Sequence, residues 1–477
     1  MIRVARCIPF LLLSMSPAHA QSIDAFDASP GGYPTSLALQ ADGKVVIVGN
    51  FLDVGGTPRS RIARLNVDGS LDPSFGDAGV DSEIKTVAVL ADGKLLIGGG
   101  FTQVGGQPRH SLARLNDDGT LDTAFADPGI DAAVWAIAVQ PDGRVIAGGS
   151  FQHVGATARS YFARLEANGA LDTTFADPQF CCNIVLSVGL QPDGHVLVGG
   201  AFSHVGADSH FALARFSTGG AFDAGFPNVP DSIVLLANDM NVAPDGSVFL
   251  AGAGAPSMRK LHADGTLDTT FNGADCDGSV YSVALQPNGK LVVAGTFHTI
   301  GGQPRHGVAR LNANGSLDAS FGDLAFGLDA THPDASVFNL AAQADGNVIA
   351  SGNFSLAGGH ARTYMARIDP GNYATSVLVV GAAAGSITAT WIRSGDGPEL
   401  AQPPMLMHST DGVHFSAVGP MARIANGWRA TASYDVHGAR FYLQVIGTTS
   451  GGAQNGSPGQ VDSEVYSSDT IFRWGFE

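Results

Sequence analysis

The stretch Val134-Trp-Ala-Ile-Ala-Val-Gln-Pro-Asp-Gly143, continued by Arg144-Val-Ile-Ala-Gly-Gly-Ser-Phe151, decides the fold class. Its apolar residues alternate with a period of two, which is typical of β-strands with one buried face. An Asp-Gly pair lies between the two runs and is the strongest short-range signal for a β-hairpin. The stretch therefore predicts two antiparallel strands joined by a tight turn.

The same hairpin signal recurs along most of the chain. In the copy quoted above, a third run, Tyr161-Phe-Ala-Arg-Leu165, and a short fourth run ending at Phe175 follow the hairpin. The turn pairs stand at Asp42-Gly43, Asp92-Gly93, Asp142-Gly143, Asp193-Gly194, Asp245-Gly246, Asn288-Gly289 and Asp345-Gly346. Copies of about fifty residues with four strands each are typical of propeller blades. We therefore predict an all-β chain with a seven-bladed β-propeller over residues 21–371.

The two ends of the repeat region complement each other. The last copy stops after Met365-Ala-Arg-Ile368 without a fourth strand, and the segment Ile23–Ser29 resembles that missing strand. Its Ala25-Phe-Asp-Ala28 repeats Ala221-Phe-Asp-Ala224 residue for residue. We expect the N-terminal segment to complete the seventh blade, which would also remove two exposed sheet edges.

After Gly371 the repeat disappears and a second, smaller domain is expected. Strand patterns at 386–391, 405–408, 414–415, 428–433 and 440–446 favour an immunoglobulin- or fibronectin-III-like β-sandwich over residues 372–447, extending to about 463. Residues 448–463 are rich in Gly, Ser, Asn and Gln, so a flexible stretch is predicted there. Residues 464–477 form a C-terminal tail with an aromatic end, interpreted either as an export tag or as an edge strand on the sandwich.

The first twenty residues predict export. Arg3 and Arg6 precede a short apolar run that ends at Ala18-His19-Ala20, the pattern of a signal peptide. That run is too short for a membrane span. The formal net charge of −17 disfavours nucleic acid as a partner, because no basic stripe is present to displace counterions from phosphates. A secreted protein in the periplasm, on the cell surface or outside the cell is expected, with a monomeric propeller.

The repeat resembles a known family. Units such as Val104-Gly-Gly-Gln-Pro-Arg-His-Ser-Leu-Ala-Arg-Leu-Asn-Asp-Asp-Gly-Thr-Leu-Asp-Thr-Ala-Phe125 look like delta-60 repeats, which are similar to a bacterial β-propeller domain of unknown function. The resemblance covers residues 22 to 371 and implies fold and export, with no catalytic residues to transfer. The copy around Asp245 departs from the pattern between Ala253 and Met258, so this blade should be trimmed on one face.

The cysteines allow several states. Cys181 and Cys182 are adjacent, and Cys276 lies at nearly the same repeat offset two copies later. A vicinal disulfide, a bond from one of the pair to Cys276, or simple burial of small side chains are the alternatives.

Motifs for catalysis and for cofactors are missing from the sequence. It holds no Gly-x-Ser-x-Gly elbow, no Walker loop, no EF-hand loop and no His-Glu-x-x-His, so we expect no catalytic residue, metal or cofactor. An Arg and an Asp recur eight residues apart in the copies, as at Arg64 and Asp72. Catalytic sites are unique whereas scaffolding repeats, so we interpret this pair as an ion pair within a blade.

Any binding site is expected at one mouth of the propeller channel, where loops pass between blades. The longest of these loops holds Asp329, His332 and Asp334, and Trp135 and Tyr281 begin strands near the same mouth. Our first hypothesis is a non-catalytic binding or structural scaffold with an unknown protein or glycan partner. The alternative is a propeller hydrolase or lyase acting on a glycan or small molecule at the channel mouth.

Overall fold

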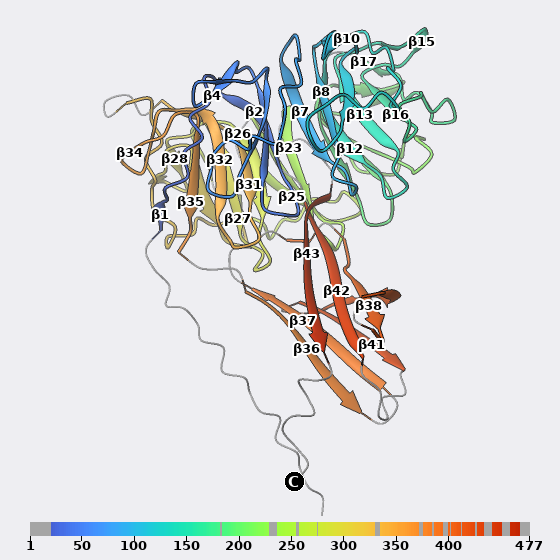
Figure 1. The fold of residues 1–477 in the computed structure, drawn as a ribbon, viewed down its shortest axis with the longest axis vertical. Helices are drawn as coiled ribbons and strands as arrows, with labels where there is room; N and C mark the ends of the chain where they lie inside the picture. The colour runs from blue at the N-terminus through green and yellow to red at the C-terminus, as the bar shows by residue number, and fades with distance from the viewer. Residues whose placement is uncertain are drawn as a thin grey trace, which may run out of the picture.

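The protein is all-β in the part of the chain that the structure describes, and its many small sheets are antiparallel (Figure 1). This computed structural model describes residues 21–181, 184–228, 236–253, 257–273, 275–329, 334–371, 375–383, 386–394, 399–400, 402–411, 413–424, 427–433, 441–450 and 458–467. The expected signal peptide and the end of the expected tail, from residue 468, lie outside these ranges.

Each repeat forms a sheet of three main strands, as the alternating pattern predicts. The sheets are β2 (Pro34–Leu39), β3 (Val45–Gly49) and β6 (Ile62–Leu65); β7 (Ile84–Val89), β8 (Leu95–Gly99) and β11 (Leu112–Leu115); β12 (Val134–Val139), β13 (Val145–Gly149) and β16 (Phe162–Leu165); β18 (Ile184–Leu190), β19 (Val196–Ala201) and β22 (Leu213–Phe216); β23 (Leu236–Val242), β24 (Val248–Ala253) and β25 (Met258–Leu261); β26 (Val280–Leu285), β27 (Leu291–Gly295) and β30 (Val308–Leu311); and β31 (Ser336–Ala342), β32 (Val348–Asn353) and β35 (Met365–Asp369), which β1 (Ser22–Ile23) joins.

The predicted fourth strand is reduced to a single bridge in the copies that end in Leu-Asp. Leu71, for example, bridges to Leu65 and then enters a turn.

A short two-stranded hairpin follows the second main strand in most repeats. These hairpins are β4 (Asp53–Val54) with β5 (Thr57–Pro58); β9 (Gln103–Val104) with β10 (Gln107–Pro108); β14 (His153–Val154) with β15 (Thr157–Ala158); β20 (His204–Val205) with β21 (Asp208–Ser209), joined by β17 (Phe180–Cys181); β28 (Thr299–Ile300) with β29 (Gln303–Pro304); and β33 (Leu356–Ala357) with β34 (His360–Ala361). The β23–β24–β25 sheet has no such hairpin among its described residues, consistent with the predicted trimming of this copy.

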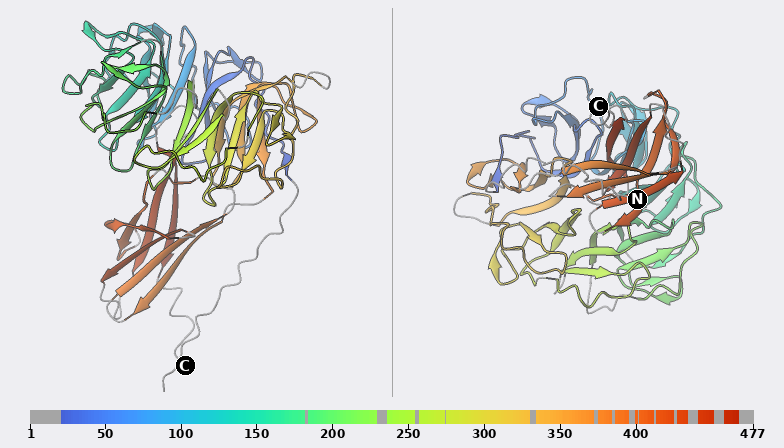
Figure 2. Two further views of the ribbon diagram at one scale, coloured as in Figure 1. Left: turned by 180° about the vertical axis from the view of Figure 1, so that it is seen from behind. Right: turned by 90° about the horizontal axis from the view of Figure 1, so that it is seen from below.

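The sheets stand side by side in a ring. Strands β2, β7, β12, β18, β23, β26 and β31 contact one another in that order, and β31 contacts β2. Figure 2 shows the ring from below, with the C-terminal strands lying over it. Buried apolar residues from neighbouring sheets form the cores, such as Val48 and Ile62 packed with Phe101 and Val104.

The N-terminal segment joins the last repeat as predicted, but in a different register. Ile23 pairs with Ile368 in β35, and Arg367 binds the Asp24 carboxylate and lies over the Phe26 ring at 5.1 Å. The sequence match had placed Asp27 at the position of the repeated aspartate. Asp24 takes it instead, because Ile23 is the apolar residue that the β35 edge can bury.

Two glycines at the end of β8 show why the repeats need them. A side chain at Gly98 would meet Val134 Cγ1 of the next sheet at 2.7 Å, so this glycine allows the close approach of a neighbouring sheet. A side chain at Gly99 would instead overlap the carbonyl oxygen of Glu83 within its own sheet.

Residues after Gly371 form two four-stranded sheets. One has the order β36 (Thr375–Ala383), β37 (Ser386–Ser394), β41 (Gly427–Ser433) and β40 (Ala422–Ile424). The other has the order β39 (Ser416–Pro420), β38 (Met405–Ser409), β42 (Tyr442–Ser450) and β43 (Pro458–Ser467). Their shared core includes Trp391, Trp428, Leu406 and Leu443.

Two local predictions in this region were wrong. The strand expected at 414–415 begins at Ser416, because the Asp411 carboxylate accepts the backbone N–H groups of Val413 and His414 and holds a turn. The stretch 448–463, predicted to be flexible, begins and ends in the paired strands β42 and β43. Cross-strand pairing satisfies the backbone here and outweighs the polar composition.

The short two-stranded hairpins, which we call the rim hairpins, and the C-terminal sheets lie at opposite ends of the ring (Figure 1). The C-terminal strands approach the end where the Asp-Gly turns lie, and Glu399 N–H donates a hydrogen bond to Leu285 O at 2.9 Å. The first strand of each sheet is called its inner strand; these are β2, β7, β12, β18, β23, β26 and β31. The opposite end of the ring, where the inner strands begin, is not covered by the C-terminal strands.

Candidate functional site

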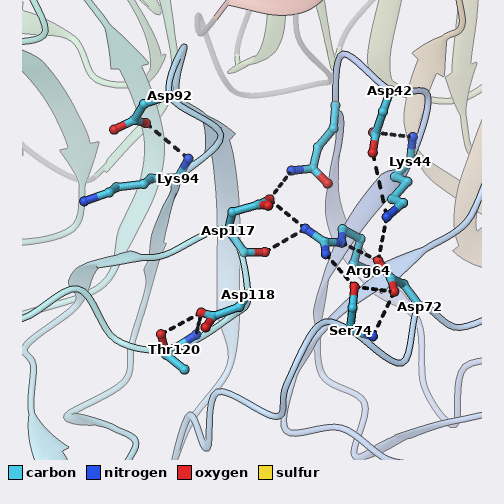
Figure 3. Close-up of polar contacts among 11 residues, drawn as sticks. Asp42, Lys44, Arg64, Asp72, Ser74, Asp92, Lys94, Asp117, Asp118 and Thr120 are labelled. Atoms are coloured by element: carbon cyan, nitrogen blue, oxygen red, sulfur yellow. Dashed lines mark hydrogen bonds and ion pairs between the residues drawn. The ribbon is translucent and has the colours of Figure 1, made fainter.

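The repeated arginine and aspartate form the ion pair within one sheet that the sequence predicted (Figure 3). Arg64 Nε donates to Asp72 Oδ2 at 2.7 Å, and Lys44 Nζ donates to the same oxygen at 3.0 Å. Arg64 also reaches the next repeat, where its Nη1 donates to Asp117 O at 2.6 Å, and it lies over the Phe75 ring at 5.1 Å. The guanidinium therefore ties together two strands, a turn and the neighbouring sheet.

These contacts recur with nearly the same geometry around the ring. The equivalent pairs are Arg114 with Asp122, Arg164 with Asp172, Arg215 with Asp223 and Arg310 with Asp318. Burial raises the pKa of the Asp122 carboxyl, but hydrogen bonds from Lys94, from Ala124 N–H and from Arg114 outweigh it and lower the pKa to about 2. Because these charged side chains pair with one another within the repeats, we do not regard them as a candidate functional site.

A β-bulge near the start of each inner strand carries a side chain that differs from repeat to repeat, unlike the repeated ion pairs. The pairing of β12 with β13 skips Trp135, because Val134 faces Gly149 and Ala136 faces Gly148. Bulges frequently re-aim a side chain beside a functional site. The skipped residues are Thr35, Lys85, Trp135, Leu186, Asn238, Tyr281 and Phe338, and we call this set the bulge ring. All seven residues differ, whereas a glycine faces the residue before the bulge in every sheet.

Neighbouring members of the bulge ring touch from sheet to sheet. Lys85 Nζ lies over the Trp135 ring at 4.5 Å, and the Tyr281 and Phe338 rings are 5.9 Å apart. Asn238 Nδ2 donates to Val280 O at 3.0 Å, and Thr35 Oγ1 donates to Ile84 O at 2.6 Å.

Two tyrosines extend the aromatic part of this ring. Tyr33, immediately before β2, is 5.6 Å from Phe338 and 6.4 Å from Tyr364 between ring centroids. Most of these side chains are only half-buried, so their faces remain accessible in part.

The structure brings some of the predicted rim residues into this ring and not others. Trp135 and Tyr281 both belong to the bulge ring, but neither touches the other. Asp329 and Asp334 are exposed, and the Asp334 carboxylate lies 3.1 Å from His298 Nε2. His332 lies outside the described residues.

Histidine and carboxylate groups on the rim pair with each other without forming a metal centre. His306 Nδ1 lies 2.6 Å from Asp323, and His110 makes the same contact with Asp127 in another repeat. This recurrence identifies a structural link between a hairpin and the following loop. No group of three or more ligand side chains able to hold a metal ion occurs within the described ranges.

Cys276 carries a free thiol. Its Sγ lies 2.9 Å from Gly278 O and 3.1 Å from Ser257 Oγ, and burial raises the thiol pKa. The cross-loop disulfide considered for Cys276 is therefore not formed. Cys181 lies in β17 and Cys182 outside the described residues, so the vicinal bond stays a prediction.

Sequence reasoning missed Lys85 and Asn238 as members of the ring. A signal was present: aligning the repeats on their turn pairs shows one column, seven residues before the first residue of the pair, that changes in every copy. That column is the bulge.

Comparisons with known proteins agree with the repeat. Six segments match the model of the family described as "Domain of unknown function (DUF5122) beta-propeller": residues 40–75, 90–125, 140–175, 191–226, 243–271 and 286–321. These six segments are thus similar to the β-propeller repeats of a family without an assigned function. No curated protein matches the chain.

Two solved structures are similar at low identity. An oligogalacturonate lyase from Vibrio parahaemolyticus is 11% identical with a TM-score of 0.42, over 72% of this chain and 92% of its own. A putative exported protein from Bacteroides fragilis is 9% identical with a TM-score of 0.30, over 75% of this chain and 95% of its own. At these TM-scores neither likeness bears on function. Within the described ranges, no helix has the length and apolar character needed to cross a membrane.

Proposed function

We propose that this chain is an exported, non-catalytic binding scaffold that holds a glycan at the mouth of a seven-bladed β-propeller. Residues 1–20 act as the signal peptide, residues 21–371 form the propeller, and residues 372 to about 463 form an immunoglobulin- or fibronectin-III-like sandwich. The propeller is monomeric, because its ring closes on itself and leaves no free inner edge. The mature protein resides in the periplasm, on the cell surface or outside the cell.

The observation that carries this proposal is the contrast between the variable bulge ring and the constant scaffold. A scaffold requires the same residues in each copy, whereas recognition of an asymmetric ligand requires different ones. The ring offers aromatic faces at Trp135, Tyr281 and Phe338 beside the ion pair of Lys85 with Glu83, whereas Asn238 is buried and donates to Val280 O. A few polar groups among aromatic faces are typical of small-ligand sites.

Two further features support a ligand at this mouth. Trp135 Nε1 is buried and has no hydrogen-bond partner among the described residues, an energetic cost that a ligand oxygen would relieve after a small ring rotation. Aromatic faces suit the apolar C–H faces of sugar rings, and the adjacent Lys85 supplies a hydrogen-bond donor for hydroxyl or carboxylate oxygens.

A glycan array with the purified mature chain tests the proposal. We expect the wild-type protein to bind a restricted set of glycans and Trp135→Ala to lose them, with only a small decrease in melting temperature because this ring is half-buried. Lys94→Arg, in a repeated ion pair, serves as the matched control and should bind normally. Absence of binding to every glycan, or equal binding by Trp135→Ala, would overturn the proposal.

One observation favours the enzymatic alternative, a hydrolase or lyase acting at the same mouth. Among the described residues, the His298–Asp334 pair has no counterpart at the same positions of the other repeats, and an imidazole beside a carboxylate suits general acid–base chemistry. Turnover of a bound glycan that disappears in His298→Ala would support this alternative over the non-catalytic scaffold.

A further inference from the structure

A half-open cleft of about 370 Å³ lies between the β23–β24–β25 sheet and the C-terminal strands. Its lining includes Phe249 and Lys260 on the sheet side and Trp428 and Arg423 on the other. Figure 1 shows β25 beside the C-terminal strands at this junction. A volume of this size is in the range of small-molecule sites.

The cleft coincides with the repeat that departs from the pattern. Lys260 stands where the other repeats have arginine, and Ala243 stands where five others have glutamine. Ser247 replaces a larger side chain that is lysine or arginine in four copies. Three residues that are larger elsewhere are therefore smaller here, and all three line the cleft.

In other repeats the arginine and glutamine positions supply hydrogen-bond donors to the turn of the following repeat. Arg215 Nη1 and Gln191 Nε2 both donate to Ala263 O, at 2.8 and 2.9 Å. Arg64 and Arg114 make the same kind of contact, to Asp117 O and Ala167 O. The expected acceptor for the departing repeat is Ala313 O, and Ala313 lines the cleft.

Ala313 O accepts no such hydrogen bond from the described residues. Lys260 Nζ is engaged by Asp268 at 3.1 Å and lies over the Phe249 ring at 5.7 Å, and no described residue donates a hydrogen bond to Ala313 O. The rings of Phe249 and Trp428 are buried and already covered by the chain's own Lys260 and Arg423, so the exposed Ala313 carbonyl is the group left for a ligand. The acidic chain, with a net charge of −17, also attracts cations.

We propose that this cleft binds a guanidinium-bearing ligand, which occupies the position where the other repeats place their own arginine. The guanidinium donates to Ala313 O, while the apolar part of the ligand contacts Met421 and Pro403. A planar fork of donors fits this position better than an ammonium group, because the other repeats place the same fork there. This site is separate from the bulge ring and goes beyond the proposed function.

Calorimetric titration of the full mature chain with n-butylguanidinium tests the inference. We expect binding to the wild-type protein, with n-butylammonium about tenfold weaker because it lacks the planar fork. Butyrate, of opposite charge, should not bind.

Two substitutions that restore the repeat provide the decisive variants. Lys260→Arg and Ala243→Gln each return a donor to Ala313 O, so each should weaken butylguanidinium binding about tenfold, an effect of about 1.4 kcal/mol. Both insert a residue that other repeats already hold at the same position, so folding should be preserved. Lys94→Arg is the matched control and should bind like the wild type.

Three outcomes would overturn the inference: no binding of butylguanidinium, tighter binding of butyrate, or unchanged binding in both restoring variants. Failure here is distinguishable from failure of the glycan proposal. Trp135→Ala should keep guanidinium binding, and Lys260→Arg should keep glycan binding.

Discussion

The ion-pair ring and the bulge ring are built from the same repeats but obey opposite rules. At the end near the Asp-Gly turns, each arginine meets its aspartate with almost the same geometry, as at Arg64–Asp72 and Arg310–Asp318, both 2.7 Å. At the other end, each inner strand carries a bulge whose side chain differs in every copy. The repeated residues support the fold through their ion pairs, and the variable residues are the basis of the proposed recognition.

The β23–β24–β25 sheet extends this comparison, because it breaks the rule within the ion-pair ring. Among the described residues, Lys260 is the one basic side chain paired with Asp268, whereas Arg64 and Lys44 both pair with Asp72. The departure falls where the C-terminal strands approach the ring.

The largest effect is expected from breaking a buried ion pair. Arg310→Ala leaves Asp318 with Lys290 as its basic partner and with hydrogen bonds from Ser320, and it should lower the unfolding free energy by about 3–5 kcal/mol, because both side chains of the pair are almost fully buried. Chemical denaturation checks this value. Arg144→Ala, which removes a basic side chain 37% exposed, is the matched control and should cost about 1 kcal/mol or less.

The next largest effect concerns the glycine that permits the bulge. Gly99→Ala forces a methyl group against the Glu83 carbonyl oxygen and should lower the unfolding free energy by about 3 kcal/mol. At the adjacent Gly100, the nearest atom to an added methyl group lies 3.9 Å away. Gly100→Ala should therefore change stability by about 0.5 kcal/mol or less, and equal effects at both sites would contradict the bulge geometry.

Acid should weaken the ion-pair ring before it affects the bulge ring. The pKa of Asp122 and Asp172 is lowered to about 2: burial raises it, but hydrogen bonds and nearby cations outweigh burial. A lowered native pKa contributes stability that is complete above the unfolded pKa, about 4, and is lost as pH falls toward 2. Melting temperatures followed by circular dichroism should fall between pH 4 and 2. Asp172→Asn should make that decline shallower, and an unchanged slope would contradict the assignment.

The smallest effect on stability is expected in the bulge ring itself. Tyr281→Ala removes a half-buried ring that contacts Phe338, and it should lower the unfolding free energy by about 1 kcal/mol. Glycan binding should nevertheless fall strongly. A large loss of stability would instead place Tyr281 in the scaffold.

The repeat could be predicted from sequence because its signals are local. Asp-Gly turns, period-two alternation and the Arg–Asp spacing each act within one copy, and the N-terminal strand was recognised by its likeness to the missing piece. Its register was not, because whether Asp24 or Asp27 meets Arg367 depends on packing of Ile23 against a strand more than 340 residues away.

The site was predicted only in part for a similar reason. Trp135 and Tyr281 stand out as aromatic residues at strand starts, whereas Lys85 acquires meaning only through its contact with Trp135 in the next sheet. The cleft beside Lys260 was not predicted, because it needs the C-terminal strands to close it. The replacement of the repeated arginine by Lys260 was nevertheless visible in the sequence.

The central claim, that variable bulge residues bind while repeated residues support the fold, is tested most directly by one paired measurement. For a glycan found on the array, dissociation constants and melting temperatures are determined for Trp135→Ala, in the bulge ring, and Arg164→Ala, in the ion-pair ring. We predict that Trp135→Ala loses binding at an almost unchanged melting temperature, while Arg164→Ala lowers the melting temperature but binds normally below it. The reverse assignment, or binding unaffected by Trp135→Ala, would contradict the account.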